Sequence, residues 1–301
     1  MRVHLIDGTF ELYRAHFAPK PPHVGPDGRD LKASLGVVQS LLGLLADRNE
    51  KVTHVAVAFD NPIRSFRNDL FAAYKSDGGV PDVLRTQFDE VENAVRSLGV
   101  VVWSMNEFEA DDALATAALH YAAMPEVDQV RVMTPDKDLG QVLQGDRVVQ
   151  VDRIRRKVIT EATQLADKGL KPNQVPDFLA LVGDTADGIP GLDGWGEKSA
   201  ALVLSAYDRI ENIPDDETTW SVTPRGAAKL SASLKAGRTD AMLYRTLATL
   251  RPDVPLTETL ADLEWRGAPR AKFIAWCDAM GSESTKTRPL RWADEARSNR
   301  S

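Results

Sequence analysis

The chain has 301 residues, of which 43% are hydrophobic and 27% charged, and its formal net charge is −7. This composition excludes a disordered or fibrous protein, and a chain of this length can bury a substantial core. A single cysteine, Cys277, excludes an internal disulfide framework and a cysteine-rich zinc site. No apolar run is long enough to span a membrane, and the first ten residues lack a signal-peptide layout, so we expect a cytoplasmic protein.

Five apolar runs in the first half of the chain are typical of buried parallel strands, because they are continuous and do not alternate with polar residues. They cover residues 3–7, 52–59, 100–103, 130–133 and 148–151. Helical spacing of apolar residues separates them, over 31–45, 84–98 and 109–121. This alternation predicts an α/β fold with a mostly parallel central sheet covered by helices.

The second half of the chain has a helical pattern. Helices are expected over 160–168, 175–182, 198–206, 225–234 and 240–250, and glycine and proline clusters separate them. We therefore expect an α/β core over residues 1–160 and a helical subdomain over 161–256. A C-terminal helix is expected over 257–280, followed by a flexible tail over 281–301.

Acidic residues gather where the predicted strands and helices begin or end. Asp7, Asp60 and Asp136 each follow a strand, and the carboxyl ends of parallel strands meet at one crevice. One such aspartate alone would more simply be a turn former or a helix cap, but three together favour a shared site. The candidate metal ligands form five clusters in the sequence: Asp7, Asp60, Glu109, Asp111, Asp112, Asp136, Asp138, Asp184 and Asp187.

An all-oxygen ligand set of this kind indicates Mg²⁺ or Mn²⁺, because zinc sites use histidine and cysteine. Two such ions ~4 Å apart are the usual apparatus for in-line phosphoryl displacement. The 44 acidic residues less these nine leave 35 against 37 basic ones, so the rest of the molecule is slightly basic. The negative net charge therefore does not exclude nucleic acid as a partner.

A glycine-rich stretch over residues 188–200 joins two predicted helices. Gly194 and Gly196 flank Trp195, and a helix with free N–H groups begins near Glu197. A generic glycine turn is the simpler alternative, but the length and order favour a helix–hairpin–helix that binds a DNA backbone without reading sequence. The candidate contacts are Gly191, Gly194, Gly196, Lys198 and Ser199.

The order of these motifs resembles a known family. The pattern comprises residues 5–8, Phe66-Arg67, Tyr74-Lys75 and the acidic motifs at 109–112, 134–139 and 183–198. Over residues 1–256 the chain is similar to the 5′–3′ exonuclease domain of bacterial DNA polymerase I and, more distantly, to flap endonucleases with a PIN-like fold. The resemblance implies a stand-alone 5′ nuclease with one metal near Asp7, Asp60, Glu109 and Asp111. It implies a second metal near Asp111, Asp112, Asp136, Asp138 and Asp184 or Asp187, and a K⁺ ion at the hairpin.

The segment after Asp60 should supply cations across the crevice from the acids. We expect Arg67 and Lys75 to act in catalysis together with Asp111 and Asp136, and the DNA contacts of this segment are Arg64, Arg67, Tyr74 and Lys75. Where the family has an arginine three residues after this lysine, in an arch over about 64–90, the chain has Gly78.

The expected substrate is duplex DNA with a 5′ flap, nick or overhang, cleaved by a monomer in replication and repair, near the nucleoid. Three alternatives differ in chemistry. A haloacid-dehalogenase-type phosphatase needs an aspartate at position 5, where the chain has Leu5. A non-catalytic DNA-binding protein would gain nothing from nine acids facing DNA. A PIN-like RNA nuclease, or cleavage of RNA primer strands, stays open.

Overall fold

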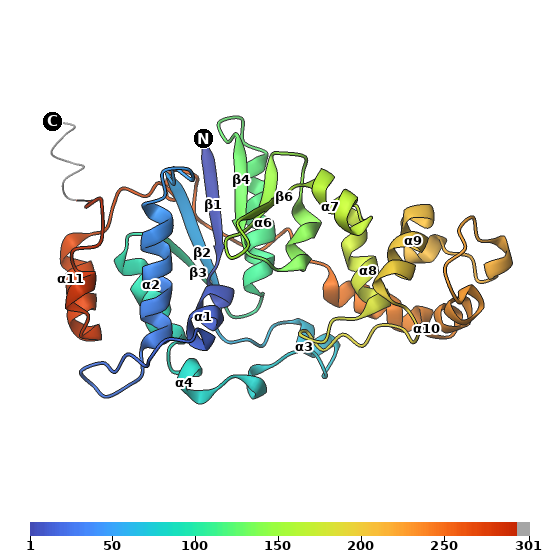
Figure 1. The fold of residues 1–301 in the computed structure, drawn as a ribbon, viewed down its shortest axis with the longest axis horizontal. Helices are drawn as coiled ribbons and strands as arrows, with labels where there is room; N and C mark the ends of the chain where they lie inside the picture. The colour runs from blue at the N-terminus through green and yellow to red at the C-terminus, as the bar shows by residue number, and fades with distance from the viewer. Residues whose placement is uncertain (294–301) are drawn as a thin grey trace.

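The computed structural model describes residues 1–293, and its core is one six-stranded sheet. Figure 1 shows the sheet near the middle of the molecule. Its strand order is β3-β2-β1-β4-β5-β6. The strands are β1 (Arg2–Asp7), β2 (His54–Asp60), β3 (Val101–Met105), β4 (Gln129–Met133), β5 (Val148–Asp152) and β6 (Lys157–Ile159). All pairs are parallel except β5 with β6, so the expected α/β fold is confirmed.

The strand order reverses direction at β1. The chain first adds β2 and β3 on one side of β1, and then β4 and β5 on the other side. Such a switch point opens a crevice at the carboxyl ends of the two central strands. Asp7 ends β1 there, and β4 ends at Met133, three residues before Asp136.

Helices cover both faces of the sheet, because successive strand residues point to opposite sides. Ile6 packs with α1 (Gly8–Phe17), α2 (Lys32–Leu45), α5 (Phe88–Ser97) and α11 (Arg270–Met280). Val3 and Leu5 pack on the other face against α6 (Ala110–Ala122). The sequence did not predict α1, whose amino end Asp7 caps by accepting the Phe10 N–H, or the edge strand β6.

Short elements connect the sheet to the site. The arch segment contains α3 (Arg67–Leu70), the 3₁₀ helix η1 (Asp77–Gly79) and α4 (Asp82–Arg85). A second 3₁₀ helix, η2 (Lys137–Val142), follows β4 and begins at the N-cap Asp136. These elements lie at the carboxyl ends of the central strands.

The helical subdomain has its own core and extends to one side in Figure 1. Its elements are α7 (Glu161–Lys168), η3 (Pro172–Gln174), α8 (Val175–Val182), α9 (Glu197–Tyr207), η4 (Ile210–Asn212), η5 (Glu217–Thr219) and α10 (Ala227–Ala248). The two helices expected over 225–234 and 240–250 are the single helix α10. Gly237 lies inside this helix and permits close packing, because a Cβ there would lie 2.7 Å from the Leu192 side chain.

The C-terminal region differs from expectation. The helix expected over 257–280 is only α11, and irregular chain precedes it. Residues 281–293, expected to be a flexible tail, form η6 (Glu283–Thr285) and place Trp292 against the core. The sequence did not predict this order, because the segment is mostly polar and only a few apolar residues hold it against the core. Residues 294–301 of the expected tail lie outside the described residues. Within residues 1–293 no helix could span a membrane.

Candidate metal centre and DNA-binding hairpin

The carboxylates that end the central strands face one cleft of about 500 Å³. Asp7, Asp60, Asp111, Asp136 and Asp187 line it, together with Lys75. Hydrogen bonds fix two of them: Thr134 Oγ1 donates to Asp7 at 2.9 Å, and the Ala110 N–H donates to Asp60 at 2.7 Å. The strand ends and the first turn of α6 therefore aim their oxygens at the same space.

Burial and mutual repulsion disfavour negative charge in this cleft. Burial raises the pKa of Asp7 to about 7, and the nearby Asp136 and Asp60 add to the shift. Burial likewise raises the pKa of Asp60 to about 6, with Glu109 adding to it and Lys75 opposing. The pKa of Asp111 is raised well above its usual value by burial and by Asp136 and Asp7. Carboxylates crowded in this way favour a bound cation.

A second cluster adjoins the cleft and consists of Asp138, Asp184 and Asp187. One oxygen from each lies within 4.8 Å of the others, as in a metal site. Asp138 Oδ1 is buried and has no hydrogen-bond partner among the described residues, although the Lys137 ammonium lies 3.6 Å away. Lys137 also pairs with Asp184. An orphaned carboxylate oxygen among all-oxygen donors fits a hard divalent cation.

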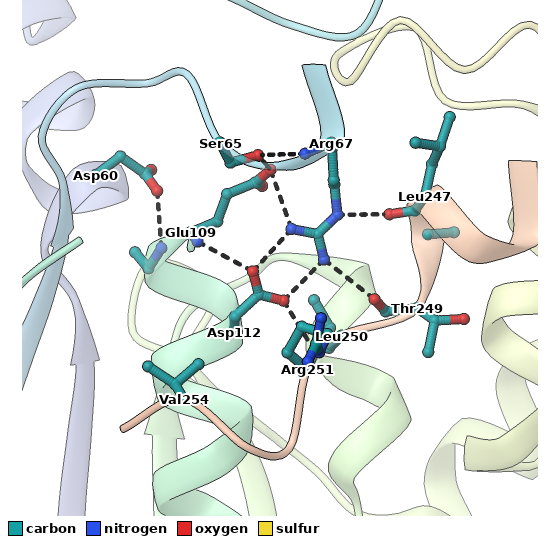
Figure 2. A network of polar contacts seen from close by, with 12 residues as sticks. Asp60, Ser65, Arg67, Glu109, Asp112, Leu247, Thr249, Leu250, Arg251 and Val254 are labelled. Carbon is teal, nitrogen blue, oxygen red and sulfur yellow. Dashed lines mark hydrogen bonds and ion pairs between the residues drawn. The ribbon is translucent and has the colours of Figure 1, made fainter. Parts of the chain in front are cut away.

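Glu109 and Asp112 are placed differently from the other seven acids, because the buried Arg67 pairs with both of them (Figure 2). The Arg67 guanidinium binds both oxygens of Asp112 at 2.7 Å, and its Nη1 lies 3.1 Å from Glu109. Ser65 donates to Glu109 at 2.6 Å. Burial tends to raise the pKa of Glu109, but Lys75 and Arg67 outweigh it and lower that pKa.

Arg67 itself is only 1% exposed, so its guanidinium is not open to the cleft. Tyr74 is also buried, and its hydroxyl donates to Glu109 at 3.3 Å. The structure thus brings both residues next to the metal centre but beneath its surface. Arg64, by contrast, is exposed and pairs with Asp69 at 2.7 Å.

Lys75 is the cation that reaches the cleft from the arch segment. Its ammonium lies 2.9 Å from both Glu109 and Asp187. Burial tends to lower the pKa of Lys75, but Glu109 and Asp187 outweigh it and hold that pKa well above its usual value. Gly78 and Gly79 follow in the exposed η1, and a Cβ on Gly78 would meet only Ser76 Oγ, at 3.6 Å, among the described residues.

The hairpin between α8 and α9 exposes its backbone. Gly194 has a φ of +81°, which favours glycine, and Gly196 is the N-cap of α9, with no described atom within 4 Å of a Cβ position. Lys198 is exposed, and Ser199 lies in the first turn of α9. Gly191 is structural, because a Cβ there would lie 2.5 Å from the Gly183 nitrogen. Four of the five predicted contacts therefore lie around an open helix N-terminus.

The sequence analysis did not identify the residues that orient the carboxylates of the candidate site. Thr134 orients Asp7, Ser65 orients Glu109, and Lys137 pairs with Asp184. Thr134 and Lys137 directly flank the motif Pro135-Asp136, so their closeness in sequence was the available signal. The sequence held no signal for Ser65, because its contact with Glu109 joins segments far apart in the chain.

Comparison with known proteins identifies the fold's relatives. Residues 2–169 match the family model of the 5′-3′ exonuclease N-terminal resolvase-like domain, and residues 170–271 match the 5′-3′ exonuclease C-terminal SAM fold. The chain belongs to the 5′-3′ exonuclease family. The family boundary at 169/170 lies close to the expected division at 160/161.

Two curated relatives of the chain differ in length. DNA polymerase I of Bacillus caldotenax is 33% identical over 289 residues, which are 93% of this chain and 31% of the relative. The 5′-3′ exonuclease of Aquifex aeolicus is 31% identical over 212 residues, covering 70% of this chain and 71% of the relative. The chain thus spans about a third of the polymerase it matches.

Solved structures of nucleases share the fold. T5 5′-exonuclease with bound zinc has a TM-score of 0.62 at 18% identity, covering 84% of this chain and 90% of the other. The catalytic core of Rad2 in complex with DNA substrate has a TM-score of 0.63 at 14% identity, covering 98% and 90%. These likenesses support the PIN-like 5′ nuclease architecture.

Proposed function

We propose that the chain is a divalent-metal-dependent 5′ nuclease that hydrolyses DNA phosphodiester bonds, as a 5′–3′ exonuclease and 5′ flap endonuclease. The observation that carries this is the joining of two carboxylate groups through Asp187, which lines the cleft and also belongs to the second cluster. Lys75 lines the same cleft and pairs with Asp187, and the family membership agrees.

The carboxylates divide into two ligand sets. Asp7, Asp60, Asp111 and Asp136 would hold one ion, and Asp138, Asp184 and Asp187 a second. When bound, Mg²⁺ or Mn²⁺ would supply an activated water and neutralise charge on the attacked phosphate. T5 5′-exonuclease binds zinc in one of its solved structures, but the all-oxygen donors of this chain favour a harder ion.

Lys75 is our proposed catalytic cation. The lysine side chain is long enough for its ammonium to leave Glu109 or Asp187 and to stabilise charge on a phosphate that enters the cleft. Glu109, Asp112 and Arg67 would act differently. Arg67 pairs with both acids, and Asp112 accepts the Glu109 N–H, so the three would position the first turn of α6. This proposal gives Glu109, Asp112 and Arg67 supporting roles. The sequence predicted Glu109 and Asp112 as metal ligands and Arg67 as a catalytic residue and DNA contact.

The hairpin would hold the duplex by its backbone. The open N-terminus of α9, with Gly194, Gly196, Lys198 and Ser199, can bind phosphate oxygens without reading bases. A K⁺ ion between hairpin carbonyls and phosphate is part of the proposal. So are a monomer, a 5′-flapped, nicked or overhanging duplex as substrate, and a place in replication and repair at the nucleoid. RNA primer strands are a further candidate substrate.

The test uses end-labelled flapped, nicked and blunt duplexes with Mg²⁺ or Mn²⁺. We expect cleavage that chelation abolishes, and Asp138→Asn should reduce turnover by about 10²-fold or more while leaving DNA affinity intact. Asp146→Asn, at an exposed aspartate away from both ligand sets, is the matched control. Unchanged activity of Asp138→Asn in chelated buffer would contradict metal-dependent chemistry, and binding without cleavage by the unaltered chain would indicate a non-catalytic DNA-binding protein.

A further inference from the structure

One helix connects the hairpin to the metal centre. α10 has 22 residues, and a helix of this length spans ~33 Å. Near its first turn, the Lys229 ammonium lies 3.0 Å from Asp193, and its side chain lies 3.4 Å from a Cβ position on Gly194. Its last residue, Ala248, lies against the elements that carry the carboxylates (Figure 2 shows this end).

Side chains of the metal centre cap the carboxyl end of α10. A helix leaves its last carbonyls without partners and carries partial negative charge there. Arg67 donates from Nε to the Leu247 carbonyl at 2.7 Å and from Nη2 to the Thr249 carbonyl at 3.0 Å. Gln141 donates to the Ala248 carbonyl at 2.8 Å and accepts from the next amide, Leu250 N–H, at 3.2 Å. Two metal-site elements therefore hold three consecutive carbonyls.

The two capping residues, Arg67 and Gln141, are also linked to the candidate metal ligands. Arg67 binds Asp112, whose Oδ1 also accepts the Arg251 N–H at 2.9 Å. Asp112 directly follows Asp111 in α6, and Gln141 lies in η2, which begins after Asp136 and contains Asp138. Each capping residue thus connects the end of α10 to one of the two groups of carboxylates.

We propose that Arg67 and Gln141 are positioning residues that set the distance between the hairpin and the carboxylates, and so select which phosphodiester bond is cut. The hairpin fixes the duplex at one end of α10, and the cap fixes the other end relative to both ligand sets. Loosening the cap at Gln141, whose side chain makes no hydrogen bond to a candidate ligand, would let the end of α10 shift while the carboxylates keep their own contacts. The inference rests on the proposed nuclease function, because the selected bond is the one that the nuclease hydrolyses.

The primary test replaces Gln141 with methionine, which keeps the length and removes both hydrogen bonds. A 5′-flapped duplex labelled at one end is cleaved at saturating DNA with Mg²⁺, and product lengths are resolved to one nucleotide. The unaltered chain should give one dominant product. Gln141→Met should spread at least a third of the product to neighbouring positions, with total turnover within about threefold. Thr246→Ala is the matched control, since its exposed hydroxyl donates to the Met242 carbonyl within α10.

A second measurement needs no activity. Amide hydrogen exchange at Leu250 and Arg251 should accelerate at least tenfold in Gln141→Met, while hairpin amides keep their rates. Arg67→Lys keeps the charge but not the forked geometry, and should broaden the products further than Gln141→Met.

The outcomes separate the two proposals. If the unaltered chain cleaves no DNA, the proposed function fails, whereas the exchange result still reports whether the cap holds α10. If it cleaves and Gln141→Met keeps a single product despite faster exchange, the cap does not select the bond. Unchanged exchange in Gln141→Met would overturn the cap itself. A slower reaction with unshifted product lengths would indicate a merely stabilising contact, and would also overturn the proposal.

Discussion

The charge state of single carboxylates links the metal centre to stability. Burial holds the pKa of Asp7 at about 7 and of Asp60 at about 6, above the usual value of 3.8. Between pH 4 and 7 these two carboxyls therefore bind more protons in the folded chain than in the unfolded chain. Its stability without metal should fall as pH rises through that window, because these carboxyls must then ionise in a buried place.

We expect the chelated protein to lose on the order of 2–4 kcal/mol of unfolding free energy between pH 5.5 and 8 from this source. Mg²⁺ should remove most of the loss, since a cation stabilises the ionised form. Urea denaturation at both pH values, with chelator or Mg²⁺, measures the effect. Asp7→Asn should flatten the slope, and a chelated protein that is most stable at pH 8 would contradict the assignment.

Lys75 gives a second prediction at this scale. Lys75→Met should lower the cleavage rate at saturating DNA by about 10²–10³-fold and change DNA affinity by less than about fivefold, because the ammonium acts on charge that develops during reaction. Arg64→Met is the matched control, since its guanidinium pairs with the exposed Asp69. Single-turnover rates and binding titrations separate the two effects. A defect in affinity alone would mean that Lys75 only binds DNA.

Among the elements, the hairpin makes the clearest prediction. Lys198 is exposed beside the N-terminus of α9, so Lys198→Ala should weaken duplex binding equally on all sequences. The slope of log affinity against log salt should fall by about one phosphate contact. Lys272→Ala, at an exposed lysine of α11, is the control. If Lys198→Ala changed the preference for DNA sequence, the hairpin would not bind the DNA through its backbone alone.

The elements also show what sequence could and could not predict. Continuous apolar runs predicted β1 to β5, and the aspartates after them predicted the crevice, because both signals are local. The pairing of Arg67 with Asp112 was not predictable, since 45 positions separate the residues and either could equally face a ligand. Gly237 misled for a related reason: its packing against Leu192 is invisible without the fold.

At the scale of the whole molecule, the C-terminal segment of residues 265–293, which we call the strap, packs against the rest of the fold. The Trp265 N–H donates to the Thr53 carbonyl, and Ala293 N–H to the Ala268 carbonyl, at 2.8 and 3.0 Å. Trp292 packs on Phe273 and carries Arg270 over its ring, at 4.3 Å. These contacts lie at the amino ends of the strands, whereas the carboxylates lie at the carboxyl ends.

Trp292→Ala should therefore destabilise the fold by about 2–3 kcal/mol through lost aromatic burial. Cleavage rate and product lengths should stay unchanged at 25 °C, because the strap and the metal centre lie at opposite ends of the strands. Thermal unfolding and the flap assay measure the two effects, with the exposed Leu290→Ala as a control of similar position. A loss of activity without a loss of stability would place the strap in the reaction.

The strap also decides where a fused module would sit. Residue 293 leaves the body at the rim where β2 begins, and the seven residues of β2 separate that rim from the cleavage cleft by ~23 Å. A tag joined at residue 293, in a chain shortened to that point, would start at the opposite end of the strands from the carboxylates. Residue 293 is thus a point at which the described part of the chain could be attached to a surface while the carboxylate cleft stays accessible.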